Sequence, residues 1–64
     1  MKFKTNWKDM PPEQFAKEVD ELLWVMDRVT IEQLHAKRFV AAAQAAGWNP
    51  WDTVQFIRRT DGLL

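Results

Sequence analysis

The chain has 64 residues, a formal net charge of zero and no cysteine, and eight of its side chains are aromatic, four of them tryptophan. Its length is near the lower limit at which a single domain can bury a core of its own. The absence of cysteine excludes a disulfide scaffold and a cysteine-ligated zinc site. The balanced charge argues against tight binding driven by a broad basic surface.

The sequence shows neither a membrane span nor a secretion signal. No apolar run approaches the ~20 residues that cross a bilayer. The opening MKFKTNWKDM lacks the apolar stretch of a signal peptide. We therefore expect one soluble domain over residues 1–64, located in the cytoplasm and without membrane contact.

Residues 1–10 form the first segment, in which Phe3, Thr5 and Trp7 alternate with polar side chains. A single strand cannot satisfy its own backbone hydrogen bonds, and the chain offers no second strand candidate. We expect an extended arm that packs on the helices. An edge strand paired across a dimer is the alternative.

The first helix is expected over residues 12–28. Prolines are well tolerated in a first helical turn and acids there complement the helix dipole, which fits Pro11, Pro12 and Glu13. Apolar side chains then recur at alternating spacings of four and three, as on the buried face of a helix. This stripe consists of Phe15, Val19, Leu22, Met26 and Val29, and it is widened by Leu23 and Val25.

A second helix is expected over residues 31–46. The stretch TIEQ fits a capping box, in which Thr30 and Gln33 each bond the backbone of the other. The chain is therefore expected to break at Val29–Thr30, with one helix continuing through this point as the alternative. Gly47 ends the helix, because glycine adopts the left-handed conformation of a C-terminal cap without penalty.

This second helix is expected to lie at the centre of the fold. Six alanines and several larger apolar side chains cover most of its circumference, so it should touch neighbours on more than one side. Its narrow polar side consists of Gln33, Lys37 and Gln44. The only histidine, His35, lies beside Phe39 and Ala42 on a helical wheel, which favours a half-buried structural imidazole over a metal ligand.

The third helix is expected over residues 50–60. Asn49 is a favourable N-cap, Pro50 suits the first helical position and Asp52 complements the helix dipole. Gly62 then supplies a stop. The expected fold class is all-α, with three helices and an N-terminal arm.

Catalysis, cofactor binding and metal binding are not expected. With one histidine and no cysteine, the chain lacks convergent titratable groups, and only carboxylates such as Glu21 and Glu32 remain as metal ligands. Pairs such as Asp20 and Glu21 fit solvated helix faces. No phosphate-binding loop or nucleophile motif is present, so we expect no small-molecule substrate.

The apolar stripe of the first helix does not need Trp24, because this residue lies about 200° from Leu22 around the helix axis. In one interpretation the N-terminal arm, with Phe3 and Trp7, folds over it. In the other it is an exposed anchor for a partner, since tryptophan is enriched at interface hot spots. The sequence leaves both interpretations open.

The stretch AAGWNPWDTV at residues 45–54 joins the second and third helices and contains two tryptophans. In one interpretation Trp48 and Trp51 pack in the core of this corner. In the other they belong to a protein-binding surface. Phe56 lies roughly 140° from Trp51, so the third helix has apolar side chains on two sides. A three-helix monomer of this size struggles to cover both, and this surplus of aromatic side chains indicates association.

The sequence therefore favours a non-catalytic interaction protein that self-associates, binds another protein, or does both, with a homodimer as the preferred assembly. Its expected anchors are Trp24, Trp51, Phe56 and Trp7, with Arg58 and Arg59 as a polar rim. Proteins of this size are often small regulators from bacteria, their viruses or mobile elements, which is an expectation from length alone.

The alternative is a DNA-binding transcriptional regulator, with nucleic acid as the less favoured partner. Residues 40–59, with Ala43-x3-Gly47 and a capped helix that ends in FIRR, resemble a helix-turn-helix. They depart from the motif at Thr53, where an apolar residue is usual, and at residues 50–52, which normally face bases and phosphates. The resemblance implies a dimer. Its DNA contacts would come from Gln55, Arg58 and Arg59, with Lys37 and Arg38 at phosphates.

Overall fold

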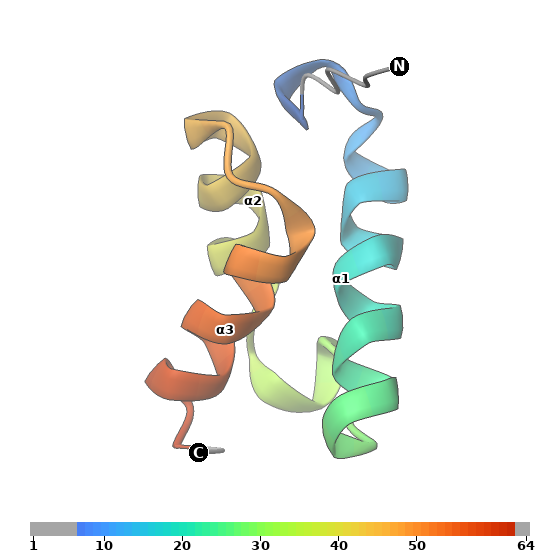
Figure 1. The fold of residues 1–64 in the computed structure, drawn as a ribbon, viewed down its shortest axis with the longest axis vertical. Coiled ribbons are helices and arrows are strands. Elements are labelled where there is room, and N and C mark those ends of the chain that lie inside the picture. The colour runs from blue at the N-terminus through green and yellow to red at the C-terminus, as the bar shows by residue number, and fades with distance from the viewer. Residues whose placement is uncertain (1–6, 63–64) are drawn as a thin grey trace.

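The computed structural model describes residues 7–62, which form three α-helices joined by short turns (Figure 1). The elements are η1 (Trp7–Asp9), α1 (Pro12–Asp27), η2 (Glu32–Leu34), α2 (Lys37–Ala46) and α3 (Pro50–Thr60), where η denotes a 3-10 turn. The all-α fold with three helices is confirmed. Of the expected arm over residues 1–10, residues 1–6, which include Phe3 and Thr5, lie outside the described residues. The described part of this segment is not extended, because Trp7–Asp9 forms the turn η1. Within the described part of the chain, no helix combines the length and the apolar character that crossing a membrane requires.

Helix α1 begins where the sequence predicts and ends one residue earlier. At its end, Arg28 adopts the left-handed conformation (φ 59°), and its N–H donates to the Trp24 carbonyl at 3.0 Å. The fully buried residues of α1 are Phe15, Val19 and Leu23. Leu22 and Met26 of the predicted stripe are half-buried. The buried face of α1 therefore lies toward the Leu23 edge of the predicted stripe, whereas Val25 at the other edge is 69% exposed.

The predicted capping box forms, but it begins the short turn η2 rather than a long helix. The Thr30 N–H donates to Gln33 Oε1 at 2.7 Å, and the Gln33 N–H donates to Thr30 Oγ1 at 3.3 Å. His35 then takes the left-handed conformation (φ 53°), and α2 starts only at Lys37. The prediction of one helix over residues 31–46 is therefore wrong in its first part.

Contacts with α1 explain this interruption. In α1, Asp20 Oδ1 accepts a bond from the Ile31 N–H at 2.7 Å, which fixes the start of η2. The Ala36 N–H then donates to the Ile31 carbonyl at 3.4 Å, a closure typical of a helix C-terminus. The chain turns in this way and buries both Ile31 and Ala36. His35 is exposed, and the prediction that it is half-buried is wrong, because it occupies the turn and not a helix face.

The corner between α2 and α3 forms as predicted. Gly47 has a left-handed φ of 87°, and the Trp48 N–H closes the end of α2 by donating to the Ala43 carbonyl at 2.9 Å. Asn49 Oδ1 accepts a bond from the Asp52 N–H at 2.7 Å, as an N-cap asparagine should. Helix α3 therefore has the predicted bounds.

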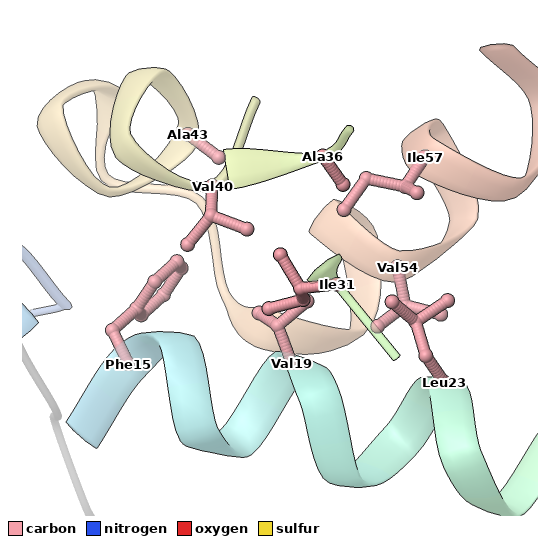
Figure 2. Packing of buried hydrophobic residues seen from close by; sticks show 9 residues of the cluster. All are labelled: Phe15, Val19, Leu23, Ile31, Ala36, Val40, Ala43, Val54 and Ile57. Atoms are coloured by element: carbon pink, nitrogen blue, oxygen red, sulfur yellow. The ribbon is translucent and has the colours of Figure 1, made fainter. Parts of the chain in front are cut away.

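The core lies between α1 on one side and α2 and α3 on the other (Figure 2). Its buried apolar residues are Phe15, Val19, Leu23, Ile31, Ala36, Val40, Ala43, Val54 and Ile57. Figure 2 shows Val40 above the first half of α1, whereas Val54 lies beside Leu23 farther along the helix. Both later helices thus depend on α1 for their burial.

Gln44 is expected on the polar side of the second helix, and this prediction is wrong. The residue is only 8% exposed. Its Nε2 donates to the Trp7 carbonyl at 3.1 Å and also to the Met10 carbonyl. A buried amide requires such partners, because leaving it unpaired costs free energy. Gln44 thus fastens the segment before α1 to the last part of α2.

Candidate protein-binding surface

Three aromatic rings from α2, the following turn and α3 pack against one another at the surface. The Phe56 ring contacts both Phe39 and Trp48, with centroids 5.4 Å apart in each pair and interplanar angles of 74° and 83°. Such edge-to-face geometry is a favoured arrangement of aromatic pairs. The exposed fraction is 40% for Trp48 and 36% for Phe56. We call Phe39, Trp48 and Phe56 the aromatic face.

The corner at Gly47 positions this aromatic face. The left-handed glycine reverses the chain, so that Trp48 leaves the end of α2 and lies against α3. On α3, Phe56 occupies the side that faces α2, where Phe39 meets it. The tight turn therefore brings together rings that are distant in the sequence and holds them in one arrangement.

Charged and polar side chains surround the aromatic face. The Cζ atom of Arg38 lies 5.2 Å from the centroid of the Phe39 ring, within the range of a cation–π interaction. A hollow of about 320 Å³ adjoins the other two rings. Its lining residues are Trp48, Asp52, Gln55, Phe56 and Arg59. Arg38 and Arg59 thus lie at the margin of the aromatic face.

The interpretation that places Trp48 and Trp51 in the core of the corner is wrong, because both are exposed, Trp51 to 51%. The buried residues of α3 are Pro50, Thr53, Val54 and Ile57. Thr53 tolerates burial because its Oγ1 donates to the Asn49 carbonyl at 2.9 Å, which satisfies the hydroxyl. Trp51 lies about 160° from Thr53 around the helix axis, so the two cannot share a face.

Trp24 is 49% exposed near the end of α1. The Cζ atom of Arg28 lies 5.7 Å from the centroid of its ring. Trp7 is half-buried against the core and precedes α1. The start of this helix, Pro12, lies twelve residues, or about 18 Å of helix, before Trp24. Trp7 therefore does not cover Trp24, and Phe3 lies outside the described residues.

Arg58 is bonded within the fold. Its Nε lies 2.8 Å from Asp27 Oδ2 in α1, and its Nη2 lies 3.5 Å from Asp27 Oδ1. The two side chains are 18% and 17% exposed. The pair joins the ends of α1 and α3, so Arg58 differs from the exposed Arg59 that follows it.

The residues predicted to contact DNA lie in different environments. Lys37, Arg38 and Arg59 are exposed, Gln55 is half-buried and Arg58 is paired. Thr53 fills the apolar position of the helix-turn-helix pattern as a buried side chain. Pro50, at the start of the helix that would read DNA, is buried as well.

Sequence reasoning missed Phe39 and Trp48 as surface residues. The predicted helix that contains Phe39 begins at residue 31, whereas α2 begins at Lys37. Phe39 lies about 100° from the buried Val40 around α2, which is the signal that separates it from the buried face. For Trp48, no periodic signal exists, because the residue belongs to a turn.

Among the described residues, no three histidine, aspartate or glutamate side chains gather where they could hold a metal ion. The exposed aromatic side chains are the feature of the described surface that most needs an explanation.

The chain matches no model of a known protein family, no curated protein and no solved structure.

Proposed function

We propose that this chain is a non-catalytic interaction module that binds another protein through the aromatic face. The observation that carries the proposal is the exposure of Trp48 and Phe56 within a packed cluster. Burying apolar surface releases free energy, and the exposed parts of these rings do not contribute it in the free protein. A partner that covers the rings would gain this free energy on binding. Tryptophan and arginine are also enriched among the residues that contribute most to binding.

The aromatic face is arranged for binding before a partner arrives. Phe56 is held between two rings in edge-to-face contacts, and Trp48 follows a closed helix end. Little side-chain entropy is therefore lost on association. Arg38 and Arg59 supply charge at the margin, as in interfaces with an apolar centre and a polar rim.

Trp24 and Trp51 are proposed as additional anchors, because each is about half exposed. Trp51 lies roughly 140° from Phe56 around α3. A flat partner surface does not reach both sides of one helix, so contact with both requires a partner that wraps around α3.

Affinity capture from cells of the source organism, followed by binding measurements with the purified partner, tests the proposal. The Trp48→Ala/Phe56→Ala variant removes the two exposed rings. Val25→Ala is the control, because Val25 is 69% exposed and lies on α1. We expect the double variant to bind at least about tenfold more weakly, given that hot-spot residues contribute about 2 kcal/mol or more. Equal affinity, with helical circular dichroism intact, would contradict the proposal.

The helix-turn-helix alternative makes a different prediction. A DNA-binding regulator should be retained on DNA or heparin and released steeply as the salt concentration rises. The interaction module should show no such retention. The ion pair between Arg58 and Asp27 and the burial of Pro50 favour the interaction module.

A further inference from the structure

The connection between α1 and α2, residues 28–36, contains neither glycine nor proline. Two of its residues, Arg28 (φ 59°) and His35 (φ 53°), nevertheless have a left-handed backbone, which is unfavourable for a residue with a Cβ atom. They are the only non-glycine residues in the described part of the chain with a positive φ. The corner between α2 and α3, by contrast, has Gly47 at its left-handed position. The turn between α1 and α2 is therefore strained at both of its ends.

The residues between the two strained positions are already close to helical. Ile31 has φ −58° and ψ −38°, which are α-helical values, and Glu32–Leu34 forms the 3-10 turn η2. A 3-10 turn differs from an α-helix mainly in the spacing of its hydrogen bonds. Rotation of the backbone at a few residues, Arg28 and His35 among them, therefore converts the connection into a helix.

The apolar spacing of α1 continues through the connection without a change of phase. The predicted stripe ends at Val29, and the same alternating steps of four and three lead on to Gln33, Ala36, Val40 and Ala43. Only Gln33 is polar among these four. A repeat that is kept over several heptads is typical of a long helix that packs along a second helix. Residues 12–46 can therefore form one helix with a single apolar side.

The contacts that hold α1 to the rest of the fold can form equally well between two copies. Helices α2 and α3 are joined by a short corner and pack together through Phe39 and Phe56, so they move as one unit. This unit is held to α1 by the core, by the bonds of Gln44 and by the ion pair of Arg58 with Asp27. When the connection straightens, each contact is remade between α1 of one copy and the α2–α3 unit of the other.

We propose that the chain forms a domain-swapped homodimer, in which residues 12–46 are one continuous helix and each α1 packs on the α2–α3 unit of the other copy. Swapping relieves the strain at Arg28 and His35 in both copies. The aromatic face lies entirely on the α2–α3 unit, so it is the same in the single chain and in the dimer. The swap therefore does not depend on the proposed function.

The two long helices of this dimer run antiparallel, as α1 and α2 do within one chain. Gln44, near the end of α2, bonds the Met10 carbonyl just before α1 begins, and the position midway between these two residues is Asp27. The two-fold axis consequently passes close to this position. Met26 and Val29, which are half-buried in the single chain, lie near the axis and gain burial there.

The bent turn competes with the swap through bonds of its own. The capping box of Thr30 with Gln33 and the bond from the Ile31 N–H to Asp20 form only when the connection is bent. In the long helix, the same backbone N–H groups donate to carbonyls four residues earlier. Substitutions that favour the bent turn and substitutions that favour the helix should therefore shift the balance in opposite directions.

The first experiment refolds the full chain from denaturant at micromolar and at millimolar concentration and measures the mass of the products by size-exclusion chromatography with light scattering. Refolding is needed because exchange between the two forms requires α1 to detach. We expect a monomer from the dilute sample and a dimer from the concentrated one. A wild-type chain that refolds only to a monomer at millimolar concentration would overturn the proposal.

The second experiment changes the connection. His35→Gly should raise the dissociation constant of the dimer by about thirtyfold or more, because glycine relieves the strain of the bent turn and weakens the long helix in both copies. Thr30→Ala should lower it by about tenfold, because the capping box is lost and alanine favours a helix. The matched controls are Ala42→Gly, at a position that is helical in both forms, and Thr60→Ala, at the exposed end of α3.

Circular dichroism establishes that each of these variants is folded. The two controls should leave the dissociation constant unchanged within about threefold, because they act equally on the monomer and the dimer. The proposal fails if His35→Gly and Ala42→Gly change the dissociation constant equally, or if Thr30→Ala weakens the dimer.

The third experiment separates a swapped dimer from an ordinary one. The chain has no cysteine, so spin labels can be attached through Glu13→Cys and Ala45→Cys, two exposed positions that line one groove in the single chain. The labelled chain is refolded with an excess of unlabelled wild type. In the dimer the labels should lie about 48 Å apart along the continuous helix, whereas in the monomer they stay close together. A dimer that keeps the short distance of the monomer is not swapped and would refute the proposal.

Discussion

Arg58 in the last turn of α3 holds Asp27, the last residue of α1, at 2.8 Å between Nε and Oδ2. Less than a fifth of either side chain is exposed. The adjacent Arg59 points to solvent beside the aromatic face. Two consecutive arginines therefore have different tasks, one in joining helices and the other on the surface proposed for binding.

Arg58→Ala is expected to lower the free energy of unfolding by about 1–3 kcal/mol, because it leaves a largely buried carboxylate without its partner. Chemical denaturation monitored by circular dichroism measures this loss. Arg59→Ala is the control and should change stability by no more than about 0.5 kcal/mol. Equal effects of the two substitutions would show that the ion pair does not fasten α3 to α1.

Gln44→Ala should destabilise the protein by about 1–3 kcal/mol, because two backbone carbonyls lose a buried donor. The loss should be greatest at one place, in the segment from Trp7 to Met10. Hydrogen exchange is the appropriate measurement, since it reports local opening separately from global unfolding. Gln14→Ala, at an exposed position of α1, should leave exchange of this segment unchanged.

His35→Gly should stabilise the protein by about 0.5–1 kcal/mol. His35 has a φ of 53°, a conformation that costs a residue with a Cβ atom roughly 1 kcal/mol or more and costs glycine almost nothing. Ala42→Gly, in the interior of α2, should have the opposite sign and destabilise by about 1 kcal/mol. Thermal denaturation of the two variants gives the comparison, and destabilisation by His35→Gly would refute the strain assigned to this turn.

Asn49→Ala should destabilise the protein by about 1 kcal/mol, because the Asp52 N–H loses its side-chain acceptor. Asn49→Asp should retain most of the stability, since a carboxylate accepts the same bond and complements the helix dipole. Denaturant titration of both variants is the measurement. Similar losses for the two substitutions would mean that the cap contributes little.

The ends of the helices were predictable where nearby residues determine them. Gly47, Asn49 and Pro50 act through backbone conformation and bonds within a few residues, so their effects can be inferred from the local sequence. The capping box of Thr30 and Gln33 was predictable for the same reason. The path of the chain after this capping box was not predictable.

The start of α2 depends on contacts that a local pattern does not contain. Asp20 binds the Ile31 N–H from another helix, and the chain turns at His35 to bury Ala36. The burial of Gln44 depends likewise on carbonyls more than thirty residues away.

The aromatic surface was only partly predictable. Helical spacing correctly separates Trp51 from Phe56, but spacing alone does not say which side of α3 faces the core. The side of α3 that faces the core is the one that carries Thr53. This residue can be buried there because its hydroxyl donates to the Asn49 carbonyl. Trp51 then remains exposed.

The bonds made by Gln44 also have a consequence for the order of folding. They join residues separated by 34 and 37 positions, whereas the turn between α2 and α3 is closed by bonds between near neighbours. Closing a long loop costs more chain entropy than closing a short one. We therefore expect the α2–α3 hairpin to become structured early, and the segment around Trp7 to dock late in the folding reaction.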